Sequence, residues 1–114
     1  LNLVENFCWN PYQLTPAQHQ KALKYMLAFF LPGRQVHIYN SQDEFLIQER
    51  PQIEMAFIDS SHEYLETKDL INWCQKNKVK WISGHDYGDN FPGVVKAVDE
   101  VGGYRFRHET IWVL

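Results

Sequence analysis

Short apolar segments alternate along this chain with segments whose apolar residues recur at helical spacing, and this alternation constrains the fold most strongly. The apolar segments, which predict strands, are residues 1–5, 35–39, 53–58 and 79–83. Helices are predicted between them at residues 16–31, 61–76 and 92–101, with a short helix or turn at 42–48. Such alternation is typical of an α/β fold with a mainly parallel sheet. Residues 104–107 and 111–114 then predict a closing antiparallel hairpin.

The first long helix has clear signals at both of its ends. Thr15 and Gln18 have the spacing of a capping box, in which each side chain bonds the other residue's backbone. Pro16 stands at the first helical position, where its missing N–H costs nothing. Pro32-Gly33 ends the helical pattern. A helix that begins after Thr15 and stops before Pro32 is therefore predicted.

Two patterns predict where the core lies. Residues 53–58 are apolar with little alternation, which is typical of a strand buried on both faces of a parallel sheet. Large aromatic side chains bury extensive apolar surface, so we expect Trp73, Trp81 and Trp112 in the core.

Composition narrows the class of protein and its partners. The chain has 114 residues, of which 45% are hydrophobic and 22% charged, so we expect a single domain spanning residues 1–114. A net charge of −3 and the lack of a basic cluster disfavour a nucleic-acid partner. The longest apolar stretch, Met26 to Leu31, is far shorter than the roughly 20 residues of a membrane span. We therefore expect a cytoplasmic protein, with Cys8 and Cys74 as buried, unreactive thiols.

Polar residues follow each of the four predicted parallel strands. They are Glu5, then Ser41 and Gln42, then Asp59 and His62, and finally His85 and Asp86. In parallel α/β sheets ligands bind beyond the carboxyl ends of the strands, so we expect these side chains to meet at one rim. Carboxylates suit Mg²⁺ or Ca²⁺, whereas mixed carboxylate and imidazole ligands suit Mn²⁺, Fe²⁺ or Zn²⁺.

Each of these residues also has a purely structural interpretation. Glu5 can be an ordinary surface acid, and Ser41 and Gln42 can be residues that cap a helix. Asp59 can stabilise the amino-terminal end of the next helix, because acids are favoured there. The coincidence of polar groups at all four strand ends is what favours a functional site.

Three segments of the chain carry a resemblance to a known family. They have the sequences AFIDSSHEY at residues 56–64, ISGHDY at 82–87 and FPGVVKAV at 91–98. Together they resemble class I S-adenosylmethionine-dependent methyltransferases, most closely the small-molecule O-methyltransferase branch related to catechol O-methyltransferase. The resemblance covers residues 54–101 at good specificity and implies a Rossmann-like, mainly parallel sheet.

The resemblance implies that part of the site binds S-adenosylmethionine. Glu5 matches the family's acid that accepts hydrogen bonds from the ribose hydroxyls. Ser41 and Gln42 match the pair that lies near the adenine. Asp59 is the fourth residue expected to bind the cofactor, and it is also expected to be catalytic.

The resemblance also implies how the reaction is catalysed. Asp59, His85 and Asp86 match the family's residues that bind a divalent cation, either Mg²⁺ or another metal ion. His62 stands where relatives have the general base, and an imidazole can accept a proton at neutral pH. The implied reaction is transfer of a methyl group to a hydroxyl of a small molecule, with Asp59 and His62 as catalytic residues.

Two other functions stay open on the residues alone. The chain could be a non-catalytic binding or assembly module that keeps the family fold. It could also be a metal-dependent hydrolase built on Asp59, His62, His85 and Asp86. Such a hydrolase would give Glu5 no role.

One departure from the family concerns its main cofactor signature. The glycine-rich turn that follows the family's first strand has no counterpart, because no G-x-G precedes Glu5. We therefore expect a domain truncated at its amino-terminal end, with the first strand and first helix missing. In the family's strand order 3-2-1-4-5-7-6 that strand is central, so its loss leaves two edges unpaired. A homodimer is one way to cover them.

Overall fold

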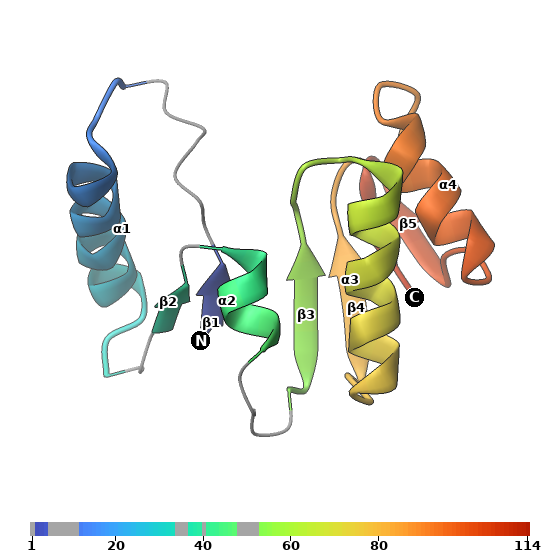
Figure 1. The fold of residues 1–114 in the computed structure, drawn as a ribbon, viewed down its shortest axis with the longest axis horizontal. Coiled ribbons are helices and arrows are strands. Elements are labelled where there is room, and N and C mark those ends of the chain that lie inside the picture. Colours follow the sequence, from blue (N-terminus) through green and yellow to red (C-terminus); the bar gives the residue numbers. More distant parts are fainter. Residues whose placement is uncertain (1, 5–11, 34–36, 40, 48–52) are drawn as a thin grey trace. The chain divides into compact units, whose positions relative to one another are not determined.

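The chain forms two compact units, residues 1–49 and 50–114. The computed structural model describes residues 2–4, 12–33, 37–39, 41–47 and 53–114 (Figure 1). The α/β class expected from the alternation is confirmed, because helices and strands alternate through both units. The single domain over residues 1–114 stays a prediction.

The first unit contains a two-stranded parallel sheet. Strand β1 (Asn2–Val4) pairs with β2 (His37–Tyr39), with Leu3 opposite Ile38. Helix α2 (Gln42–Leu46) follows directly after β2. The parallel pairing is the one expected from two strands joined through a helix.

Helix α1 (Pro16–Phe30) begins and ends close to the predicted positions. The capping box is confirmed: the Thr15 backbone N–H donates to Gln18 Oε1 at 2.8 Å, and the Gln18 backbone N–H donates to Thr15 Oγ1 at 3.3 Å. With 15 residues α1 is the longest described helix. No helix in the described ranges has the length and apolar character needed to cross a bilayer.

The second unit is a four-stranded sheet with two helices. Its elements in chain order are β3 (Met55–Ile58), α3 (Tyr64–Lys76), β4 (Trp81–Gly84), α4 (Pro92–Glu100), β5 (Phe106–His108) and β6 (Ile111–Val113). The strand order is β3-β4-β6-β5, with β3 parallel to β4 and the remaining pairs antiparallel. The carboxyl-terminal antiparallel hairpin is therefore confirmed. The sheet is mixed, so a mainly parallel Rossmann-like sheet stays a prediction.

Helices α3 and α4 lie side by side and bury one face of this sheet (Figure 1). The buried hydrophobic residues of these elements are Ile71 and Cys74 of α3, Val94, Ala97 and Val98 of α4, and Ile58, Ile82 and Trp112 of the sheet. The expectation for Trp112 is confirmed, since its side chain is fully buried. Burial raises the pKa of the Cys74 thiol to about 11, which fits an unreactive thiol. Cys8 lies outside the described residues.

The opposite face of the sheet is exposed, and this corrects two predictions. Trp81 is 51% exposed and Phe57 is 53% exposed, so Trp81 is not a core residue. Residues 53–58 do not form a strand buried on both faces, because Met55 and Phe57 point away from the helices while Ile58 is buried. Successive side chains of a strand point to opposite faces, and α3 and α4 cover only one of them.

Gly84 offers a test of how tightly the buried face is packed. A Cβ at this position would lie 2.5 Å from the Ile58 carbonyl oxygen and would overlap the Trp112 indole. Gly84→Ala should therefore lower the free energy of unfolding by roughly 1–3 kcal/mol. Urea denaturation checks this. Gly88→Ala is the matched control, because the nearest atom to its new Cβ, Thr110 Cγ2, is 3.8 Å away. Equal midpoints for the two variants would contradict this packing.

Candidate functional site

The carboxyl ends of β3 and β4 bring two of the predicted polar segments together. The two strands are parallel, and Ile58 at the end of β3 pairs with Gly84 at the end of β4. The His85 backbone N–H donates to the Ile58 carbonyl at 3.1 Å, which extends the pairing by one step. Asp59 follows Ile58 directly, so it leaves the sheet beside His85 and Asp86.

The carboxylate of Asp86 lies between two imidazoles. Its Oδ2 is 2.8 Å from His62 Nε2, and its Oδ1 is 2.9 Å from His85 Nδ1. The Asp86 side chain is only 12% exposed. A buried carboxylate is stable only where charged or hydrogen-bonding partners surround it, and the two histidines are those partners.

The backbone of Asp86 adopts an unusual conformation that this arrangement requires. Its φ angle is +63°, in the left-handed region. Aspartate enters this region more readily than most residues, because its short polar side chain can bond locally. This backbone conformation lets the Asp86 carboxylate contact the imidazole of the preceding residue, His85.

His62 is held from both sides. Its Nε2 lies 3.6 Å from Asp59 Oδ1, in addition to the contact with Asp86. The Phe91 ring lies against the imidazole, with 4.5 Å between ring centroids. A Cβ on Gly93 would lie 2.6 Å from the His62 carbonyl oxygen, so only glycine lets α4 begin this close to the loop.

His85 uses both of its ring nitrogens within the protein. Nε2 is 2.8 Å from Thr110 Oγ1, in the turn between β5 and β6. The Trp112 indole N–H donates to the His85 carbonyl at 3.0 Å. Since Nδ1 faces the Asp86 carboxylate, the Nδ1–H donates there and the Thr110 hydroxyl donates to Nε2. His85 therefore orients Asp86 and has no nitrogen free for a metal.

A small pocket lies beside these residues. It is lined by Ile58, Asp59, Ser60, His62, Thr67, His85, Val94 and Trp112. The hydroxyls of Ser60 and Thr67 are buried and have no hydrogen-bond partner. A buried hydroxyl without a partner lowers the stability of the fold. Apolar packing alone therefore does not explain these two hydroxyls.

Three side chains are close enough to share a metal ion. One ligand atom from each of Asp59, His62 and Asp86 lies within 4.8 Å of the others. Two carboxylates and an imidazole are an ordinary donor set for a divalent cation. The metal ligands predicted from the sequence were Asp59, His85 and Asp86. In the structure His62 lies near both carboxylates, and His85 contacts only that of Asp86.

Of the four predicted cofactor residues, Asp59 belongs to this cluster, and Ser41 and Gln42 lie in the first unit. Ser41 caps α2, since its Oγ accepts from the Glu44 backbone N–H at 3.1 Å, and Gln42 is the first residue of that helix. Both belong to the first unit, whereas Asp59 belongs to the second. Glu5 lies outside the described residues. The roles of these residues toward a cofactor stay predictions.

Sequence analysis missed the residues that support the site. Phe91 and Gly93 belong to the segment FPGVVKAV that carries the family resemblance, but that pattern did not indicate their contact with His62. Thr110 had no signal, because a threonine in a hairpin turn is common. Thr67 looked like an ordinary residue within a helix, and only the fold shows that it lines the pocket.

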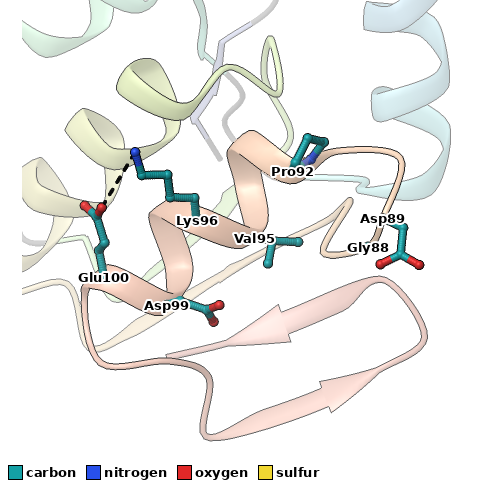
Figure 2. A pocket seen from close by; sticks show the side chains of 7 residues that line it. All are labelled: Gly88, Asp89, Pro92, Val95, Lys96, Asp99 and Glu100. Atoms are coloured by element: carbon teal, nitrogen blue, oxygen red, sulfur yellow. Dashed lines mark ion pairs between the residues drawn. The ribbon is translucent and has the colours of Figure 1, made fainter.

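A second, more open hollow of about 590 Å³ runs along α4 (Figure 2). Two of the three acids that line it have partners: Asp99 Oδ1 accepts from the Tyr87 hydroxyl at 2.8 Å, and Glu100 Oε2 is 2.7 Å from Lys68 Nζ. The hydrogen bond from Lys68 lowers the pKa of the Glu100 carboxyl. No predicted site residue lines the described part of this hollow, so the cluster around Asp86 is the stronger candidate.

Comparisons with known proteins assign no family to the chain. No family model matches it, and neither a curated protein nor a solved structure matches it. Any function proposed for the chain therefore depends on its own residues and their arrangement.

The hydrogen bonds of His85 predict its tautomer. In alkaline buffer its ring should carry the proton on Nδ1, because Nε2 accepts from Thr110. Long-range ¹H–¹⁵N correlation of the histidine rings measures this directly. Thr110→Val should shift the ring toward a mixture of tautomers. Thr67→Val, which removes a hydroxyl without a partner, should leave the ring unchanged. Protonation of Nε2 in the unaltered protein would refute the assignment.

Proposed function

We propose that the chain acts in S-adenosylmethionine-dependent methyl transfer to a hydroxyl group of a small molecule. One observation carries the proposal: the three segments that resemble methyltransferases, separated in sequence, all contribute to the surroundings of Asp86. Residues 56–64 supply Asp59 and His62, residues 82–87 supply Asp86 itself, and residues 91–98 begin at the Phe91 ring against His62.

The order of the strands supports the same proposal. The sheet order β3-β4-β6-β5 corresponds to strands 4-5-7-6 of the family, and the β1–β2 pair corresponds to strands 2 and 3. In both arrangements the last two strands are antiparallel. A mainly parallel, Rossmann-like sheet is part of the proposal, as is a cytoplasmic location.

The proposed reaction moves one methyl group and one proton. The acceptor oxygen attacks the methyl carbon of the sulfonium, the carbon–sulfur bond breaks, and its electron pair stays on sulfur. The hydroxyl proton must leave before or during this step. His62, between Asp59 and Asp86, has two tasks open to it: it accepts that proton, or it helps to hold a cation that lowers the pKa of the hydroxyl.

Cofactor binding is the part of the proposal that involves residues far apart in sequence. Asp59 has a half-exposed carboxylate that can accept hydrogen bonds. Glu5, Ser41 and Gln42 keep the roles that the resemblance implies, toward the ribose and the adenine. Hydrogen bonds to a charged acceptor contribute about 1.5–3 kcal/mol each, so each acid should matter measurably.

An assembly module without catalysis is the second candidate, and the exposed sheet face favours it. Met55, Phe57, Trp81 and Phe106 are each more than half exposed on that face. Contiguous apolar surface of this kind marks interaction sites in many proteins. In that case the chain would self-associate and would not bind the cofactor.

Calorimetric titration with S-adenosylmethionine and S-adenosylhomocysteine tests the proposal. We expect saturable binding that weakens about tenfold or more in Asp59→Asn and in Glu5→Ala, because each removes a charged acceptor. Asp69→Asn, an exposed acid on α3, is the matched control and should bind as the unaltered chain does. Folded protein that binds neither compound, but sediments as an oligomer, would reject the methyltransferase and favour the assembly module.

A further inference from the structure

We infer that Asp59, His62 and Asp86 together bind a divalent transition-metal ion through two carboxylates and one imidazole nitrogen, while His85 only orients Asp86. The inference deepens the proposed function, on which its catalytic meaning rests. It changes the metal ligands expected from the sequence by replacing His85 with His62. The binding itself can be measured without any methyl transfer.

The spacing of the donor atoms fits a single ion. His62 Nε2 lies 2.8 Å from Asp86 Oδ2 and 3.6 Å from Asp59 Oδ1. Ligand atoms about 2.1 Å from one ion lie about 3 Å apart when they are adjacent. All three donors lie within 4.8 Å of one another, which is near the spacing within one coordination sphere. In the His62 tautomer with its proton on Nδ1, Nε2 has the lone pair that an ion needs.

A second observation points to a ligand at the same place. Thr67 is 1% exposed and lines the pocket together with Asp59 and His62, and its hydroxyl has no hydrogen-bond partner. The Ser60 hydroxyl there is buried without a partner as well. Buried hydroxyls without a partner are uncommon in native structures, and an ion beside them is one of the explanations that such groups call for. The two unpartnered hydroxyls beside Asp59 and His62 therefore support an ion at the cluster.

The two histidines differ in what their nitrogens can offer. Both nitrogens of His85 have partners, Asp86 Oδ1 at 2.9 Å and Thr110 Oγ1 at 2.8 Å. If His85 bound the metal, it would lose either its hydrogen bond to Thr110 or its hydrogen bond to the Asp86 carboxylate. Carboxylates that bind a metal are themselves held by hydrogen bonds, and His85 supplies such a bond to Asp86.

The donor set selects among cations. Mg²⁺ and Ca²⁺ prefer oxygen ligands alone, whereas an imidazole nitrogen favours Mn²⁺, Fe²⁺, Co²⁺ or Zn²⁺. This has a consequence for the proposed reaction. A His62 whose Nε2 is bound and whose Nδ1 carries the ring proton is not a proton acceptor, so the acceptor hydroxyl would be activated through the cation.

Pulsed electron paramagnetic resonance with Mn²⁺ alone as the probe tests the inference. We expect the ¹⁴N coupling of one directly bound imidazole in the unaltered protein. His62→Asn should abolish that coupling and weaken Mn²⁺ binding at least tenfold; asparagine tolerates the φ angle of +65° at this position. His85→Asn is the matched control and should keep the coupling, even if affinity falls.

Each other outcome contradicts the inference in a different way. Coupling that persists in His62→Asn and disappears in His85→Asn would make His85 the ligand. Bound Mn²⁺ without nitrogen coupling would mean that only the carboxylates bind the ion. If the folded protein bound neither Mn²⁺ nor Zn²⁺, the proposed metal site would be rejected. A second measurement needs no variant: a small amount of Mn²⁺ should broaden the ring signals of His62 more than those of His85.

These results separate the metal site from the proposed function. Imidazole coupling at His62 with no binding of S-adenosylmethionine would keep the metal site and reject methyl transfer. Cofactor binding without the coupling would keep the proposed function and reject this ligand set. Mg²⁺ added in tenfold excess should leave the Mn²⁺ signal in place, because it lacks affinity for the nitrogen ligand.

Discussion

The partly buried Asp86 carboxylate is the constraint on which the site depends. A carboxylate this deeply placed needs partners on both oxygens, and it has His62 on one and His85 on the other. Meeting both partners requires the left-handed backbone at Asp86 and a loop before α3 that brings His62 back toward β4. The geometry of the cluster follows from these requirements.

The fold supplies each partner from a different element. The parallel pair β3 and β4 brings Asp59 beside His85. The turn of the carboxyl-terminal hairpin supplies Thr110, which fixes the His85 ring from behind. At the start of α4 the Phe91 ring packs against His62. Gly93, two residues later, leaves room for the His62 backbone. The hairpin and α4 therefore belong to the site as much as the strand ends do.

Sequence reasoning predicted the elements well and the side-chain contacts only in part. The capping box at Thr15, the α/β class and the closing hairpin each depend on local patterns, and they were correct. Convergence of Asp59, His62 and Asp86 followed from the rule for parallel strand ends. The separate tasks of His62 and His85 depend on Thr110, which is distant in sequence and carries no signal. Trp81 was placed wrongly, because apolar character alone does not say which face of a sheet is covered.

The claim that His62, and not His85, completes a metal site with Asp59 and Asp86 can be observed directly. Crystals of the protein grown with Mn²⁺ would be measured for anomalous scattering at the manganese edge. We predict one peak within ligand distance of Asp59, His62 and Asp86, with the ring of His85 still bonded to Thr110. A peak on the His85 ring with the Thr110 bond broken, or no peak with His62 still bonded to Asp86, would contradict the account.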